Sequence, residues 1–211
     1  MGVTSNKVTK TGQMILTASF PVGITCRPDA PCLRRTKEGG GCYGNRGHMA
    51  ARNYKDAMMK NLELYNTSPD GYYYEIHNRL LLVPYKFFRW FVTGDIPDKR
   101  FLPEVAVRLA KEHPGTQFLM FTKKYEIVNE YLDEGNEIPS NLKIILSCWG
   151  NFIPENPHKL PMSYVKFKDE SRNANIPEDA KPCNGKCEVC VNAGGGCWNL
   201  QNGESVVFNK H

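Results

Sequence analysis

Short apolar runs alternate with helix-forming stretches along the chain between residues 14 and 167. The apolar runs are bounded by Pro, Gly or charged turns, which predicts buried strands. Between them, apolar residues recur at helical spacing among strong helix formers. The expected strands are 14–20, 87–92, 117–121, 142–146, 162–167 and 204–208, and the expected helices are 48–65, 72–83, 102–112 and 125–133.

This alternation predicts a mostly parallel sheet of about five or six strands, open or partly closed into a barrel, because a helix between two strands returns the chain to the same end of the sheet. We therefore expect one α/β domain over residues 1–211. The stretch 168–211 is polar, rich in Pro and Gly, and holds four of the cysteines, so we expect a cysteine-rich extension packed on that domain.

Composition narrows the class of protein. A chain of 211 residues that is 41% hydrophobic can bury a full core. No stretch approaches the roughly 18 apolar residues of a membrane span, and residues 1–13 lack the apolar centre of a signal peptide. We therefore expect a cytoplasmic protein with no membrane partner. The net charge of +5 is spread along the chain and permits nucleic-acid binding without arguing for it.

Seven of the eight cysteines form two clusters, and in a reducing compartment clustered cysteines are more often metal ligands than disulfides. The second cluster has the spacing C-x3-C-x2-C, at Cys183, Cys187 and Cys190, and Cys197 follows a glycine run. Glycine turns allow these thiolates to converge, so we expect a metal centre. The spacing suits zinc and an iron–sulfur cluster alike, and the terminal His211 is a further candidate ligand.

The first cluster is looser, with Cys26, Cys32 and Cys42 in C-x5-C-x9-C spacing. Pro and Gly around these cysteines favour a metal-binding loop over free or structural thiols. Arg34, Arg35 and Lys37 lie within this loop and could make it electropositive. The eighth cysteine, Cys148, stands alone at a strand end, where a buried small hydrophobe is expected.

Polar residues follow the expected strands, and in parallel α/β sheets the carboxyl ends of strands carry the active site. They are Thr93, Gly94 and Asp95 after the second strand, Lys123 after the third, and Ser147 and Asn151 after the fourth. Asp95 either contacts a cofactor or closes a turn, and Lys123 either joins the site or lies on a solvated face. Arg89 interrupts an apolar strand and needs an anionic partner if it points inward, so we expect it to share a polar cavity with Asp95.

The runs 25–26, 42–44, 88–95 and 118–123, with the terminus 208–211, resemble the phage gene product 88 family. That resemblance implies the cytoplasm of a phage-infected or prophage-bearing bacterium. More distantly, the chain resembles the radical S-adenosylmethionine (SAM) superfamily, which implies a partial (βα)6 barrel with a three-cysteine loop after the first strand. It also implies that a [4Fe–4S] cluster and SAM are bound there. Under this resemblance the cofactor contacts are Tyr43, Thr93, Gly94, Asp95, Ser147 and Asn151, and the catalytic candidates are Asp95, Arg89 and Lys123.

The superfamily's C-x3-C-x2-C spacing stands in the tail of this chain instead of after the first strand, so three functions stay open. The first is a radical SAM-type enzyme with one or two clusters, an electron donor and an unknown substrate. The second is a zinc-stabilised binding protein, with nucleic acid as a candidate partner, and the third is an iron–sulfur redox protein that does not use SAM. We also expect the two cysteine clusters to approach each other, because the last strand of a partly closed barrel returns beside the first.

Overall fold

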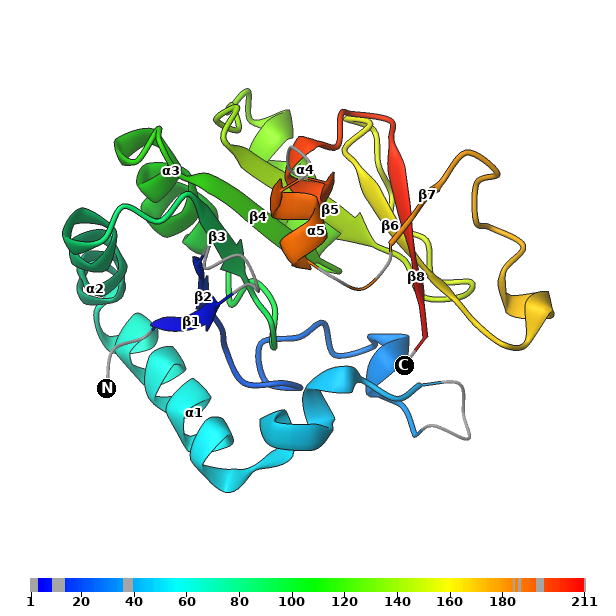
Figure 1. The fold of residues 1–211 in the computed structure, drawn as a ribbon, viewed down its shortest axis with the longest axis horizontal. Helices are drawn as coiled ribbons and strands as arrows, with labels where there is room; N and C mark the ends of the chain where they lie inside the picture. Colours follow the sequence, from blue (N-terminus) through cyan, green and yellow to red (C-terminus); the bar gives the residue numbers. More distant parts are fainter. Residues whose placement is uncertain are drawn as a thin grey trace.

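The computed structural model describes residues 4–8, 14–35, 40–183, 185, 187–192 and 196–210. Within them the chain forms an eight-stranded sheet of order β1-β2-β3-β4-β5-β6-β8-β7, in which β1 is antiparallel to β2 and all other neighbours are parallel (Figure 1). The strands are β1 Thr4–Val8, β2 Met14–Ala18, β3 Phe87–Trp90, β4 Gln117–Thr122, β5 Leu142–Ser147, β6 Met162–Lys166, β7 Lys181–Pro182 and β8 Ser205–Asn209. The α-helices are α1 Arg52–Thr67, α2 Pro69–Leu82, α3 Arg108–Glu112, α4 Tyr125–Asp133 and α5 Cys187–Asn192, and α3 continues a π-helix, Leu102–Val107. The 3-10 helices are Pro31–Leu33, Tyr43–Asn45, Gly47–Ala50, Glu170–Arg172 and Gly196–Asn199.

The predicted α/β class and the mainly parallel sheet are confirmed. Every expected strand and helix is present, with bounds that differ by a few residues. The sheet is larger than expected, because β7 adds a parallel strand at one edge and β1 an antiparallel strand at the other. Among the described residues, no helix has both the length and the apolar character needed to cross a membrane.

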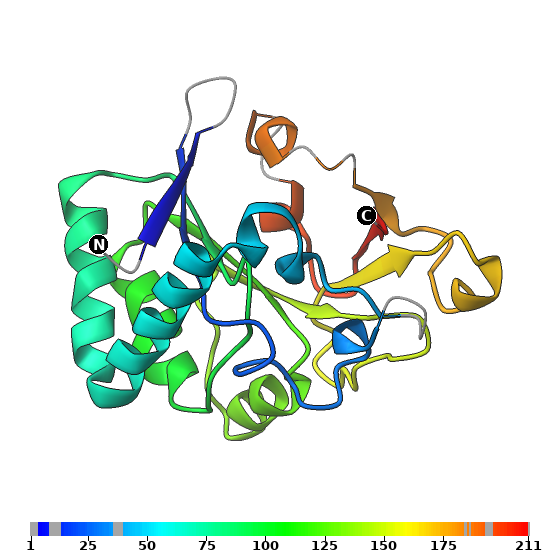
Figure 2. The same cartoon turned by 90° about the horizontal axis from the view of Figure 1, so that it is seen from below.

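The two faces of the sheet are covered differently. Helices α1 to α4 and the π-helix bury one face, and their apolar residues pack with Leu16, Phe88, Phe118 and Ile144. The tail covers the opposite face with a smaller set of residues, among them Trp198. Figure 2 shows α4 and α5 on opposite sides of the sheet. Successive right-handed crossovers that all advance in one direction place their helices on one face, as observed here.

The expectation that the final strand lies beside the first is wrong for the described residues. β8 pairs with β6 and β7, and strands β3 to β6 separate it from β2. The free edge of β2 is occupied instead by β1, whose antiparallel pairing runs from Thr4 opposite Ala18 to Val8 opposite Met14. Because a strand edge accepts one neighbour, β1 prevents β8 from closing the sheet there.

A histidine pair joins α2 to the end of α3 and predicts a pH effect on stability. His77 Nδ1 lies 3.0 Å from His113 Nε2 and 3.1 Å from the Tyr73 hydroxyl, and Glu112 and Arg108 lie alongside. Burial, and then the charge of His77, lower the pKa of His113 below its ordinary 6.5, while Glu112 opposes the shift. A histidine whose pKa is lowered by folding stabilises the native state fully above pH 6.5, and this contribution is lost as pH falls through 6.5 toward the folded pKa.

We therefore expect the free energy of unfolding in urea to be lower at pH 5.5 than at pH 7.5, and His113→Asn to reduce that difference. His158→Asn is the matched control, because His158 is a partly exposed histidine that bonds to Asp133 on α4. A His113→Asn variant whose stability changes with pH as much as that of the wild type would contradict the assignment.

Candidate functional site

The first cysteine loop is hydrogen-bonded to the turn that follows β3. The backbone N–H of Asp95 donates to Thr25 Oγ1 at 3.0 Å, and that hydroxyl donates to the Pro21 carbonyl at 3.2 Å. The Tyr43 hydroxyl donates to the Val92 carbonyl. The loop and the turn therefore form one unit at the carboxyl ends of β2 and β3, as the predicted topology required.

The backbone of that turn is unusual. Phe91, the buried aromatic residue directly after β3, has φ +55°, and a bulky residue in the left-handed region stores strain. Gly94 follows with φ +79°, and a Cβ there would lie 2.6 Å from the Phe20 carbonyl oxygen. Glycine is needed at position 94 because the backbone of Phe20, just after β2, passes directly against it.

The thiols of Cys26, Cys32 and Cys42 gather at this turn. A hydrogen bond from Cys32 is the main cause that lowers the pKa of Cys42, and the same contact raises the pKa of Cys32. Burial raises the pKa of Cys26, whose sulfur accepts a hydrogen bond from the Gly23 N–H at 3.4 Å. The three cysteines that sequence spacing linked only weakly are thus brought together.

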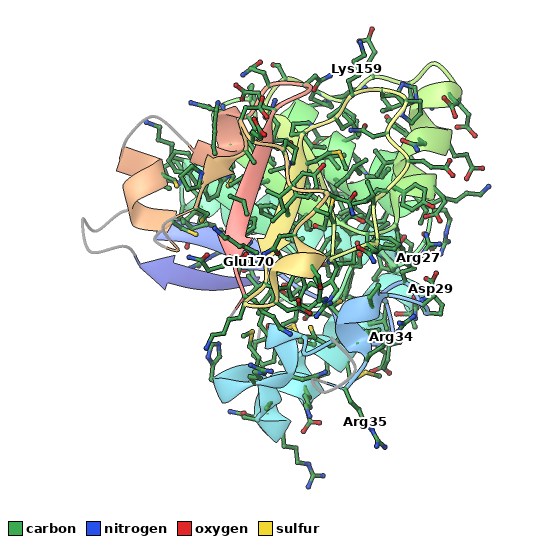
Figure 3. The ribbon with its side chains drawn as sticks, turned by 90° about the vertical axis from the view of Figure 1, so that its right-hand side faces the viewer. Arg27, Asp29, Arg34, Arg35, Lys159 and Glu170 are labelled. Carbon is green, nitrogen blue, oxygen red and sulfur yellow. The ribbon has the colours of Figure 1, made fainter. Side chains whose placement is uncertain are left out.

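Lys123 lies beside these thiols. It follows β4, it is half-buried, and its positive charge opposes the rise in pKa at Cys26 and Cys32 and adds to the lowering at Cys42. Arg34 and Arg35, by contrast, are exposed, and Figure 3 shows them along the outer edge of the loop. The positive charge near the thiols therefore comes from Lys123 at the end of β4 and not from the two arginines. Lys37 lies outside the described residues.

Asp95 is buried in the turn after β3 and joins that turn to the end of β4. Its carboxylate accepts hydrogen bonds from the Thr122 hydroxyl at 2.5 Å, the Lys123 N–H at 2.9 Å and the Ile96 N–H at 2.8 Å. Burial raises the pKa of Asp95 although all three hydrogen bonds lower it. The structure thus gives Asp95 a turn-closing role and fixes the backbone that carries Lys123. Its predicted contact with a cofactor stays a prediction.

The other residues predicted at the strand ends differ in environment. Thr93 is buried, and its hydroxyl donates to the Phe20 carbonyl and contacts the Tyr54 hydroxyl. Ser147 is buried and accepts from Ser163, whereas Asn151 is exposed. Thr93 therefore links the segment after β2 to α1 through hydrogen bonds. The cofactor contacts predicted for Thr93, Ser147 and Asn151 stay predictions.

Arg89 lies on the sheet face that the tail covers. Its guanidinium carbon is 5.3 Å from the centre of the Phe121 ring, and its Nε is buried with no hydrogen-bond partner among the described residues. Its charge lowers the pKa of both Tyr43 and Cys197, although burial raises each of them. Arg89 therefore stands between the first cysteine loop and the tail, whereas Asp95 lies within the strand-end turn. The predicted cavity shared by Arg89 and Asp95 has no support from a described contact.

The four tail cysteines form a second group. Cys183, Cys187 and Cys197 pack against the apolar residues of the tail face. Burial raises the pKa of Cys197 to about 12, and the charges of Cys183, Cys190 and Cys187 add to this rise. Cys190 is so close to Gly196 that a Cβ on the glycine would lie 2.5 Å from the Cys190 sulfur. The tail cysteines therefore lie on one face of the sheet, and their convergence on a single centre stays a prediction.

The two thiol groups occupy different places, one at the strand ends and one on the sheet face. No disulfide joins the eight cysteines. Within the described part of the chain, no three His, Cys, Asp or Glu side chains form a ready-made site for a metal ion. Metal ligation by either group stays a prediction, and His211 lies outside the described residues.

The chain matches the model of the gene product 88 family over residues 1–194. It belongs to the phage gene product 88 family. No curated protein and no solved structure is significantly similar to it. Membership confirms the first resemblance seen in the sequence and adds no cofactor, substrate or reaction.

In this gene product 88 chain, several residues that shape the site escaped the sequence analysis. Thr25 and Thr122 anchor the turn that contains Asp95, and Arg27 pairs with Asp29 and Glu126 to fasten the first loop to α4. Thr25 stands next to Cys26 and Thr122 next to Lys123, so adjacency to the predicted strand ends was the one available signal. Arg27 carried none, because its partner is 99 residues away in the chain.

Proposed function

We propose that this protein binds an iron–sulfur cluster through Cys26, Cys32 and Cys42, and that it uses the cluster with SAM for radical chemistry. The observation that carries the proposal is the gathering of these three thiols beside Lys123 at the carboxyl edge of a sheet in which the parallel strands β2 to β6 follow chain order. Three thiolates leave one metal position open for a ligand, whereas four would close the site.

The donor set fits a cluster. Cysteine ligands must be deprotonated. Burial raises the pKa of Cys26, and the contact with Cys42 raises that of Cys32, while the Gly23 N–H bond to Cys26, the Gly44 N–H bond to Cys42 and the Lys123 charge act in the opposite direction and favour thiolates. Hydrogen bonds to sulfur and nearby charges are also the groups through which proteins tune cluster potentials. When bound, a cluster with an open iron would supply one electron to SAM, and the protein would then need an external electron donor.

The residues around the thiols have positioning roles in this proposal. Asp95 holds the backbone of Lys123 through the Lys123 N–H, so the ammonium group is carried to the thiols on a rigid support. Lys123 offsets the negative charge of the ligated thiolates. Tyr43 fastens the loop through Val92, and Gly94 allows the close approach of β2. The substrate is not specified by these contacts.

The tail group supports a second, closed centre. Two of the four tail thiols lie on α5, and Cys183, Cys187 and Cys197 pack against an apolar face; four thiols in one segment suit a structural zinc ion or an additional cluster. If the tail holds zinc and the first loop holds no cluster, the second candidate function applies, which is a zinc-stabilised binding protein. The observation that favours it is the partial burial of Cys183, Cys187 and Cys197 against the sheet.

Anaerobic purification, with reconstitution by iron and sulfide, tests the proposal. We expect a brown protein that contains iron and sulfide and cleaves SAM when dithionite is supplied. The variant with Cys26, Cys32 and Cys42 all changed to Ser is expected to cleave SAM at least tenfold more slowly than the wild type and to lose the iron of that site. The reason is that no other open three-thiol group lies among the described residues.

The matched control is Cys148→Ala, because Cys148 is buried near Lys123 but lies outside both thiol groups. It should keep its iron content and its SAM cleavage. A colourless wild-type protein with stoichiometric zinc would overturn the proposal in favour of the binding protein, and a reversible cluster that leaves SAM intact would favour the redox protein.

A further inference from the structure

A groove with a volume of about 460 Å³ lies between α4 and the segment that joins β5 to β6. Five of the side chains that line it are acidic, and these are Glu126, Glu130, Asp133, Glu134 and Glu155. The whole chain carries a net charge of +5, so the groove differs in sign from the protein around it. A cluster of acidic residues is commonly a solvated face, so the acids alone do not indicate a ligand.

The basic side chains of the protein neutralise only part of this acidic groove. Neither Glu134 nor Glu155 forms an ion pair within the described part of the chain, and the Glu134 carboxylate accepts only from the Asn136 amide, at 3.3 Å. The other three acids do have basic partners, which are Arg27 for Glu126, Lys99 for Glu130 and His158 for Asp133. Two carboxylates in the groove are therefore left without a cation.

The end of α4 adds to the negative potential of the groove. Asp133 is the last residue of α4, Glu134 is its C-cap, and the last turn contains no basic residue. The free carbonyl groups at the C-terminus of a helix carry partial negative charge, so cations stabilise this end and anions destabilise it. The two acids here are therefore placed where a bound positive group would stabilise the helix.

The groove also contains a buried acceptor that has no donor. Asn129 is 8% exposed and lines the groove, and its Nδ2 donates to the Glu155 carbonyl at 3.1 Å, which ties the two walls together. Its Oδ1 has no hydrogen-bond partner among the described residues. A buried amide oxygen nearly always has a donor, so this one indicates a donor that the chain itself does not supply. This observation is independent of the carboxylates and leads to the same kind of ligand.

We propose that this groove binds an arginine-rich segment of a partner protein. A guanidinium group combines a permanent positive charge with five donors, which suits the carboxylates and the orphaned amide oxygen alike. Tyr125 and Pro157 also line the groove, and long basic side chains pack their methylene stems on such apolar surface. An inorganic cation lacks such a stem, and no three acidic, histidine or cysteine side chains of the described residues form a ready-made metal site.

The partner would lie beside the first cysteine loop, because Arg27 follows Cys26 in the sequence and pairs with Glu126 in the groove. The inference does not depend on the proposed function, since none of the groove residues is a proposed metal ligand. Iron content and SAM cleavage of the same preparations test the proposed function separately.

The experiment uses the full chain and titration calorimetry at low salt, and the probe is a capped pentapeptide in which three arginines alternate with glycine. We expect this peptide to bind at least tenfold more tightly than the same peptide with uncharged citrulline in place of arginine. The double variant Glu134→Gln, Glu155→Gln should bind the arginine peptide at least tenfold more weakly than the wild type. The matched control is Glu137→Gln, Glu178→Gln, which changes net charge equally at two exposed residues outside the groove, and it should bind within twofold of the wild type.

A second measurement uses the wild-type protein alone and so avoids any effect of a variant on folding. The arginine peptide should slow the carbodiimide coupling of an amine to Glu134 and Glu155 and leave that of Glu137 and Glu178 unchanged, as read by mass spectrometry. The inference is overturned if the peptide does not bind at millimolar concentration, if the citrulline peptide binds equally well, or if both double variants lose binding to the same extent. Spermidine that binds as tightly as the peptide would overturn the assignment to a protein segment. A dimer of this chain that the peptide dissociates would overturn the assignment to a different protein.

Discussion

Asp95→Ala is expected to lower the free energy of unfolding by about 3–5 kcal/mol. The substitution leaves the Thr122 hydroxyl and the N–H groups of Lys123 and Ile96 buried without their acceptor. Each unpaired buried donor costs about 1–3 kcal/mol. The turn can relax partly around the cavity, so we expect the total loss of stability to be smaller than the sum for three unpaired donors. Urea unfolding of the metal-free protein in reducing buffer, analysed by linear extrapolation, measures the difference.

Asp98→Ala supplies the control for that prediction. Asp98 lies in the same loop and also accepts hydrogen bonds, from the Tyr65 hydroxyl at 2.7 Å and from Arg100, but its side chain is 39% exposed. Water can replace Asp98 at these donors, so we expect a cost of about 1 kcal/mol. If Asp95→Ala costs no more than Asp98→Ala, the three hydrogen bonds do not hold the turn, and the support proposed for Lys123 fails with them.

The order of strands and helices was predictable because each buried segment carries its own local pattern. The segment 125–133 shows the clearest case, since its helical period and its flanking turns gave the bounds of α4 as they are observed. β1 could not be predicted, because Thr4–Val8 reads TSNKV and is polar except for Val8. It forms only by pairing with the edge of β2, and a strand defined by its neighbour leaves no hydrophobic period in the sequence.

The candidate site shows the same division. The rule that parallel strands expose their carboxyl ends on one edge predicted that the cysteine loop, Asp95 and Lys123 would lie near each other. It could not predict that Asp95 points into the turn, nor that Arg89 points to the tail face, because side-chain direction depends on the register of β3 with β2 and β4.

Trp198→Ala is expected to have the other large effect on stability, because this side chain attaches the tail to the sheet. Trp198 is 4% exposed, its ring centre is 5.3 Å from that of Phe87, and its Nε1 donates to the Phe88 carbonyl at 3.4 Å. Removing a buried tryptophan costs about 3–5 kcal/mol through lost burial and the cavity that remains. Asn199→Ala, at the exposed next position, should change stability by no more than about 0.5 kcal/mol.

The same variant separates two ways in which the tail can be held. If apolar packing attaches the tail, Trp198→Ala destabilises the protein whether or not metal is present, because Phe87 and Leu119 lose the same contacts in both states. If a metal centre at the tail cysteines clamps it, Cys190→Ser destabilises only the metal-loaded protein, since binding energy appears as folding energy only when metal is bound. We expect both contributions, with Trp198→Ala lowering stability in both states and Cys190→Ser adding a loss in the loaded state beyond about 3 kcal/mol. A Cys190→Ser protein that keeps its metal content and melting temperature would show that the tail is held by packing alone, and the second centre would then have no structural role.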